Sequence, residues 1–94
     1  MPSYLSLLEN AIADCQLETD VVPQSVTTFI NTYYPTATKA QYDADVQQRL
    51  AGQGQFCNLV CGAAYVWCVK QHGNTFGGHA MCQGQYSNCI SNCP

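Results

Sequence analysis

Two cysteine-rich stretches near the end of the chain, CNLVCGAAYVWC (57–68) and CQGQYSNCISNC (82–93), decide the fold. The first spaces its cysteines as C-x3-C-x6-C and the second as C-x6-C-x3-C, so the second pattern is the first read backwards. If each stretch is helical, its three cysteines fall within roughly 40° of one another around the helix axis. Each predicted helix therefore carries its three sulfur atoms in one line.

The mirrored spacing predicts three nested disulfides between two antiparallel helices. When the second helix folds back on the first, facing positions have a constant sum of residue numbers. That sum is shared by the pairs Cys57–Cys93, Cys61–Cys89 and Cys68–Cys82. The intervening HGNTFGG (72–78) is rich in turn and helix-stop residues, as a fold-back centred on Thr75 requires. Disulfides need Cα atoms within about 7 Å, which favours the nested set over other pairings.

Two other interpretations of the six cysteines are a chance pattern and a metal site. Zinc sites more often use C-x2-C or C-x4-C with returning histidines, and six collinear thiols on two helices do not form a tetrahedral cage. We therefore prefer structural disulfides, and we predict neither a metal site nor a cofactor.

The twin C-x3-C pairs, Cys57/Cys61 and Cys89/Cys93, resemble those of the α-hairpinin peptides, which are secreted helical hairpins with nested bridges. The resemblance covers residues 57–93 and implies antimicrobial, inhibitory or channel-blocking activities. The added Cys68–Cys82 pair, the longer gap and the N-terminal extension depart from that family. Twin C-x3-C pairs also occur in small chaperones of the mitochondrial intermembrane space, but low charge and many Asn and Gln residues favour secretion.

The N-terminal half is predicted to supply further helices. Residues 4–15 place apolar side chains at helical spacing, and Pro2 and Ser3 suit the start of that helix. A second element lies between Pro23 and Pro35. Its apolar spacing fits a helix, but its residues also have strong β propensity, so a strand is the alternative.

A third helix is marked by its ends. Thr38 and Gln41 form a capping-box signature, and Gly52 is expected to be the C-cap. Its apolar stripe consists of Tyr42, Val46 and Leu50. We therefore predict one all-α domain (1–94), a compact bundle of four to five short helices. Residues 1–51 form a helical scaffold and residues 55–93 the disulfide-stapled hairpin.

The two hairpin helices differ in apolar content. The first has an apolar stripe beside its cysteines, formed by Phe56, Val60, Ala63 and Trp67, which can pack on the N-terminal helices. The second offers only Met81, Tyr86 and Ile90 among polar residues and glycine. We therefore expect the second helix to be held by sulfur more than by packing.

Composition indicates an oxidising compartment. Seven cysteines in 94 residues are typical of small secreted proteins, which lack a large core. Only 10% of residues are charged, the net charge is −3, and no basic patch suits nucleic acid. The sequence shows no signal-peptide pattern and no stretch that could span a membrane, so we expect the mature form of a secreted, extracellular protein.

Cys15 is left over from the three pairs. It lies on the apolar face of the first predicted helix, which favours a buried free thiol. The alternative is an intermolecular Cys15–Cys15 disulfide in a homodimer, because secreted proteins seldom keep an unpaired thiol.

No arrangement of residues typical of catalysis is present, so we predict that the protein is not an enzyme. His72 and His79 flank the turn without a third metal ligand, and the acidic pairs at 18/20 and 43/45 do not resemble a calcium loop. These residues are better interpreted as polar surface.

The remaining hypothesis is a binding protein: an effector, toxin or signalling ligand for a protein partner. Its predicted contact surface is the tip, QHGNTFGGH (71–79), through His72, Asn74, Phe76 and His79. Three more aromatic residues are candidates for contact, although core packing is preferred for the first and last: Tyr33, Tyr34 and Trp67.

The alternative function is an extracellular carrier of a lipid or other small apolar ligand. That hypothesis requires a cavity, for which the candidate lining residues are Phe29, Ile30, Val60 and Trp67.

Overall fold

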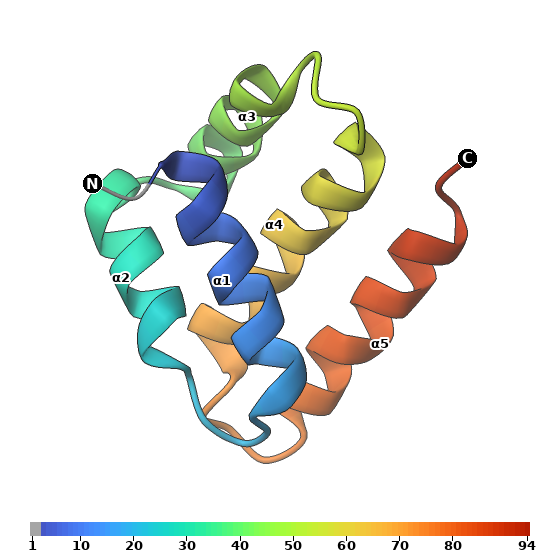
Figure 1. The fold of residues 1–94 in the computed structure, drawn as a ribbon. Coiled ribbons are helices and arrows are strands. Elements are labelled where there is room, and N and C mark those ends of the chain that lie inside the picture. The colour runs from blue at the N-terminus through green and yellow to red at the C-terminus, as the bar shows by residue number, and fades with distance from the viewer. Residues whose placement is uncertain (1–2) are drawn as a thin grey trace.

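A computed structural model describes residues 3–94, so Pro2 lies outside the described residues. This part of the chain contains helices and no strand (Figure 1). The helices are α1 (Tyr4–Leu17), α2 (Gln24–Tyr33), α3 (Lys39–Leu50), α4 (Phe56–His72) and α5 (Gly78–Ser91). The predicted all-α fold is confirmed.

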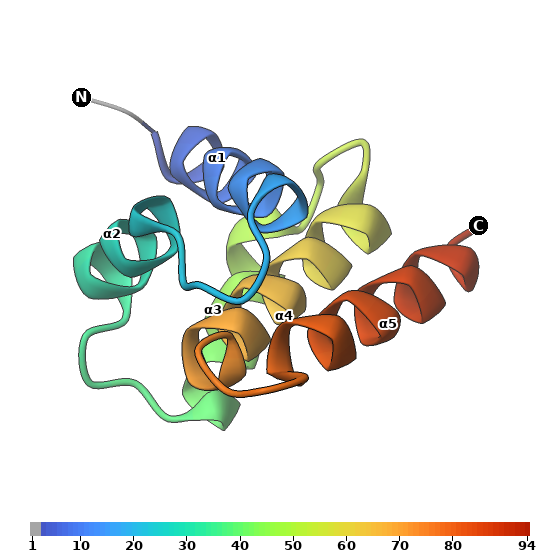
Figure 2. The ribbon, with the colours of Figure 1, turned by 90° about the horizontal axis from the view of Figure 1, so that it is seen from below.

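Helix α4 is the centre of the bundle. It contacts each of the other four helices, and α5 runs beside it at the edge of the molecule (Figure 2). The radius of gyration is 12.3 Å, close to the roughly 12 Å expected of a compact chain of this length. Within residues 3–94, no helix combines the length and the apolar character needed to cross a bilayer.

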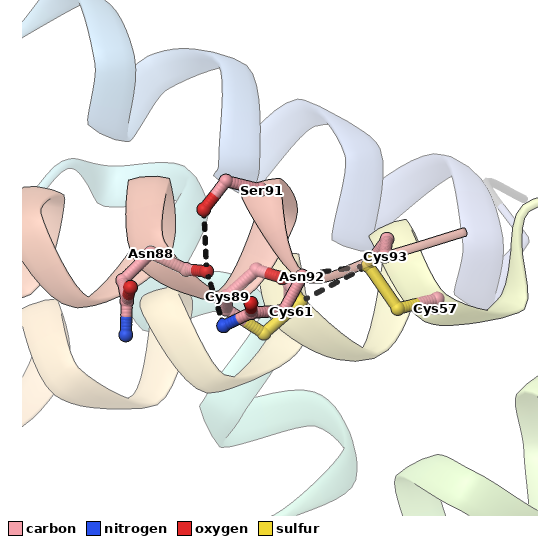
Figure 3. The surroundings of a disulfide bond; sticks show 7 residues. All are labelled: Cys57, Cys61, Asn88, Cys89, Ser91, Asn92 and Cys93. Carbon is pink, nitrogen blue, oxygen red and sulfur yellow. Dashed lines mark hydrogen bonds between the residues drawn. A yellow bond between two sulfur atoms is a disulfide. The ribbon is translucent and has the colours of Figure 1, made fainter.

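Three disulfides join α4 to the segment that returns beside it, in the predicted nested order. Cys82 and Cys89 of this segment lie on α5, and Cys93 lies just after its end. They link Cys57 to Cys93, Cys61 to Cys89 and Cys68 to Cys82. The two Cα atoms of each pair are 5.7 Å apart, so the two segments of the hairpin run side by side at constant separation. Figure 3 shows the two bonds at the open end of the hairpin. The mirrored spacing therefore predicted the pairing correctly.

The first two helices form as the apolar spacing predicts. Ser3 is the N-cap of α1, where its hydroxyl accepts a hydrogen bond from the Ser6 amide at 3.1 Å. The second element is a helix rather than a strand. Pro23 is its N-cap, one position before the first helical turn, and the helix ends at Tyr33, two residues before Pro35.

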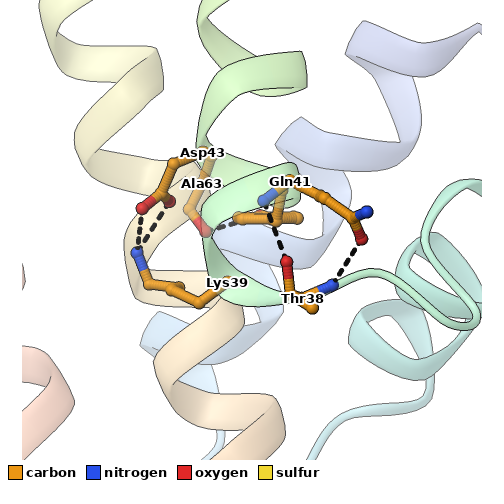
Figure 4. A network of polar contacts seen from close by, with 6 residues as sticks. Thr38, Lys39, Gln41, Asp43 and Ala63 are labelled. Carbon is orange, nitrogen blue, oxygen red and sulfur yellow. Dashed lines mark hydrogen bonds and ion pairs between the residues drawn. The ribbon is translucent and has the colours of Figure 1, made fainter.

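Helix α3 starts at the predicted capping box. The Thr38 hydroxyl accepts from the Gln41 amide at 3.2 Å, and the Gln41 side chain accepts from the Thr38 amide at 2.9 Å (Figure 4). The predicted C-cap is off by one residue: Ala51 is the cap, and Gly52 follows it with a φ of +90°. Glycine takes this left-handed conformation without steric cost, which explains why the helix ends there.

The core contains a cluster of aromatic rings. Tyr42 is fully buried, and its hydroxyl donates a 2.6 Å hydrogen bond to the Ala63 carbonyl of α4. This bond satisfies a polar group that burial would otherwise leave unpaired. Rings from α1, α2 and α3 meet edge-to-face around it, and the participants are Tyr4, Phe29, Tyr33, Tyr34 and Tyr42.

Candidate functional site

The turn that closes the hairpin is held by its own backbone. The amide of Thr75 donates to the His72 carbonyl at 3.0 Å, and the amide of Gly78 donates to the Thr75 carbonyl at 3.0 Å. Gly77 adopts a φ of +76°, which lets α5 begin at the next residue. With the Cys68–Cys82 bond nearby, the tip is a fixed structure rather than a loose loop.

Three of the four predicted tip residues are exposed. The Phe76 side chain projects fully into solvent, and His72 and Asn74 are also exposed. A phenylalanine in this position contributes nothing to the core and leaves its whole ring available for contact.

The fourth, His79, is not on the tip surface, which corrects the prediction. It is buried, and its Nε2 lies 2.8 Å from the Cys15 carbonyl. Because a carbonyl can only accept, Nε2 carries the proton and donates. The Tyr65 hydroxyl donates to the same carbonyl at 2.8 Å. His79 therefore ties α5 to the end of α1. It precedes Cys82 by three residues, and that helical spacing was the signal for an inward-facing side chain.

Cys15 is also fully buried, which argues against the intermolecular disulfide in this fold. Burial, and secondarily the charges of Asp14 and Glu18, raises the pKa of the Cys15 thiol to about 12. A neutral thiol without solvent access cannot reach a second copy of the chain. Of the two alternatives, the buried free thiol is the one that the structure supports.

Tyr34 was a candidate contact residue, but it is buried and joins a chain of polar contacts. Its hydroxyl donates to the Asp45 carboxylate at 2.6 Å and accepts from the Tyr4 hydroxyl at 2.6 Å. Burial and the hydrogen bond to Asp45 raise the pKa of Tyr34. The Tyr34 hydroxyl in turn holds the pKa of Asp45 below its usual value, with help from Arg49 at 2.8 Å. Tyr33, as preferred, packs half-buried against this cluster.

An open groove of about 690 Å³ lies at the tip end of the hairpin. Its apolar wall combines Trp67 of α4, Phe76 of the turn and Met81 of α5. Trp67 is half-buried, with its ring 4.6 Å from that of Tyr42, so it serves both the core and the groove. The polar side chains on the lining are Lys39, Gln71, His72, Thr75 and Gln85.

Sequence reasoning found only part of this tip groove. His72 and Phe76 were predicted, whereas Asn74 is exposed without lining it. Trp67 was a contact candidate for which core packing was preferred, and Gln71 lies within the predicted tip. Met81 and Gln85, which are one helical turn apart on α5 beside the Cys68–Cys82 bond, were missed. That spacing could have placed them on one surface, but no pattern brings Lys39 of α3 to the same place.

The tip groove suits the binding of apolar groups. Phe76 and Met81 are exposed, and half-buried Trp67 lines the groove beside them. Lys39 already pairs with Asp43 at 2.6 Å, so its charge is largely compensated. The polar side chains can therefore orient a ligand by hydrogen bonds, while the apolar wall supplies most of the free energy of binding.

Comparison of the chain with protein-family models, curated proteins and solved structures finds no significant match. The resemblance to the α-hairpinins therefore stays a prediction.

Proposed function

We propose that this protein is a small secreted protein that acts by binding a protein partner, and that the tip groove is its binding site. The observation that carries the proposal is the apolar wall of the tip groove, formed by exposed Phe76 and Met81 beside half-buried Trp67. Aromatic residues and methionine are enriched at protein interfaces, and the largest contributions come from a few such side chains.

The position of the groove supports the same proposal. Its walls come from two helices joined by the Cys68–Cys82 bond, so the groove keeps its shape without a partner. A preformed surface loses little conformational entropy on binding. Three disulfides, together with a seventh cysteine buried away from oxidants and other thiols, suit an oxidising extracellular compartment.

The test is a selection of peptides from a displayed random library against the oxidised protein. Binding affinity is then compared for the wild-type chain and for Phe76→Ser and Met81→Ser. We expect losses of roughly 5- to 30-fold for each, the range in which contact residues become hot spots. Emission from Trp67, the only tryptophan of the chain, should shift on binding.

A matched control is Phe56→Ser. Phe56 is also exposed, but it lies at the opposite end of the hairpin and outside the tip groove. Binders whose affinity falls equally with Phe56→Ser, or does not fall with Phe76→Ser, would contradict the assignment of the site.

A carrier of small apolar ligands is the second candidate, favoured by the groove volume of about 690 Å³, since ligand pockets commonly span roughly 300–1,000 Å³. The predicted cavity does not account for it, because Phe29 and Ile30 are buried in the core and only Trp67 of the four candidates lines the groove. Titration with a long-chain fatty acid, followed by Trp67 emission and native mass spectrometry, separates this function from peptide binding.

A further inference from the structure

The exposed apolar side chains gather at one end of the molecule. Among the described residues, four of the five large ones lie there: Leu17, Val21, Phe76 and Met81. Phe76 and Met81 belong to the tip groove, whereas Leu17 is the last residue of α1 and Val21 lies in the connection to α2 (18–23). Leu17 is 81% exposed and contributes little to the core. The tip groove alone does not account for Leu17 and Val21.

The connection between α1 and α2 is fastened beside the tip turn. A Cβ placed on Gly73 would lie 3.2 Å from Cγ2 of Val22, so this valine packs directly on the start of the turn. At the end of α1, the Cys15 carbonyl accepts the hydrogen bond from His79 of α5. Figure 1 shows the connection and the turn together at the lower end of the fold. The surface of the tip therefore continues onto the connection.

The end of α1 also carries three carboxylates, which we call the acidic rim. Asp14 lies in the last turn of the helix, Glu18 is the C-cap, and Asp20 follows in the connection. The last turn has no basic side chain, although the C-terminus of a helix favours cations. Within the part of the chain that the structure describes, none of the three carboxylates takes part in an ion pair.

The basic groups of this end do not neutralise the acidic rim. Lys39 is bound to Asp43 at 2.6 Å. Lys70 and His72 lie in the last turn of α4, and in residues 3–94 neither forms an ion pair with a carboxylate. A cationic side chain from a partner can therefore supply the charge that the end of α1 lacks.

We propose that the binding surface extends from the tip onto this connection and that its partner is a basic protein segment. Apolar side chains of that segment cover Leu17 and Val21 beside Phe76, and its Lys or Arg side chains face the acidic rim. This inference rests on the proposed function, because it names the chemistry of the partner that the tip binds.

Charge selects the partner, and apolar contact holds it. Like charges that face each other across an interface are disfavoured, so the acidic rim rejects acidic segments. Exposed ion pairs add little affinity, but they accelerate association in a salt-dependent way. Burial of Leu17 and Val21 supplies the longer-lived part of the contact. The same carboxylates are repelled by anionic lipid, which disfavours a membrane surface as the occupant.

The test presents two displayed peptide libraries to the oxidised full-length chain at low ionic strength. Both contain apolar residues, but charged positions are restricted to Lys and Arg in one library and to Asp and Glu in the other. We expect binders from the basic library alone. Glu18→Gln should slow their association by roughly 2- to 5-fold, and added NaCl should remove this difference. Leu17→Ser should weaken binding by roughly 3- to 10-fold through faster dissociation.

Glu9→Gln is the matched control. Glu9 is exposed on the same helix and its replacement changes the net charge equally, but it lies roughly 13 Å before Glu18 along α1. The variants at Leu17 and Glu18 should fold, because both side chains are exposed. Equal slowing by Glu9→Gln and Glu18→Gln would overturn the proposal, since only the net charge would then matter.

Two results separate this inference from the proposed function. Binders of either charge that need Phe76 but tolerate Glu18→Gln and Leu17→Ser would overturn the basic partner and leave the tip groove as the binding site. Basic binders that need Leu17 and Glu18 but not Phe76 would keep the connection as a site and contradict the tip groove. A basic library without binders, or retention on phosphatidylcholine vesicles that Leu17→Ser abolishes, would overturn the inference.

Discussion

The first three helices and the last helix are held in place by different interactions. Helices α1, α2 and α3 each bury three residues in a shared core, and the polar chain from Tyr4 to Arg49 crosses all of them. Helix α5 also buries three residues, Gly78, His79 and Cys82, but none of them is a large apolar side chain. Its other attachments include the disulfides, the His79 hydrogen bond to the Cys15 carbonyl, and a stack of Tyr86 on Tyr65 with 4.6 Å between ring centroids. A small chain can therefore add a helix without enlarging its core, provided that covalent bonds replace the missing apolar burial.

Reduction of all three disulfides should have the largest effect, and it should fall on α5. Each bond contributes roughly 3 kcal/mol when taken singly, by the loop-entropy argument. After reduction, we expect hydrogen exchange of the α5 amides to accelerate far more than that of the α3 amides. If α5 keeps its protection after reduction, packing holds that helix and the contrast between the two regions is wrong.

Truncation of apolar side chains should lower the free energy of unfolding more in the first three helices than in α5. Phe29→Ala removes a fully buried ring and should cost roughly 3–5 kcal/mol, whereas Ile90→Ala on half-buried α5 should cost less than about 1.5 kcal/mol. Urea unfolding of the oxidised variants measures both. Equal losses would show that α5 contributes to the core as much as α2 does.

Glycine substitutions sharpen the comparison within α5 itself. A Cβ at Gly84 meets nothing within 4 Å, so Gly84→Ala should stabilise the protein by roughly 0.5–1 kcal/mol through helix propensity. The control is Gly78→Ala, where the Cβ would overlap the His72 carbonyl and should destabilise. Thermal unfolding distinguishes stabilisation by the first substitution from destabilisation by the second. Destabilisation by Gly84→Ala would show that α5 packs more tightly than its exposure indicates.

Acid should slightly lower the free energy of unfolding through Asp45 in the N-terminal region. The pKa of Asp45 is lower in the folded protein, chiefly through the hydrogen bond from Tyr34, so the folded state releases this proton more readily than the unfolded chain. The stabilisation is present above the unfolded pKa and is lost as pH falls through the lower folded value. It is small because the Asp45 side chain is 38% exposed. Urea unfolding between about pH 5 and about pH 2 should show a weaker pH dependence for Asp45→Asn than for wild type.

A thiol-alkylating reagent should not label the native protein. Iodoacetamide should add no mass to the oxidised, folded chain and one label, at Cys15, after denaturation, because the thiol is buried and its pKa is raised to about 12. Rapid labelling under native conditions, or a disulfide-linked dimer, would show that Cys15 is accessible.

Local patterns predicted most of the backbone. Three side-chain environments were not predicted, because they depend on how helices distant in the sequence pack against one another. His79 was placed on the tip because it follows the turn in sequence, yet α1 covers it through the Cys15 carbonyl. Tyr34 follows the end of α2, yet its hydroxyl reaches Asp45 of α3. The tip groove includes Lys39 from a third element, which no spacing rule connects to the turn.

The sequence by itself determined most of the helices, the N-terminal caps of α1 and α3, and the three disulfide pairs. Each of these follows from short-range geometry: a capping box spans one turn, and two mirrored cysteine lines can face each other in only one antiparallel alignment. Only the tertiary structure decided which tip residues reach solvent, that Cys15 is enclosed, and where the groove lies. Those features depend on how separate helices pack, and packing is set by the sum of many weak contacts between residues distant in sequence.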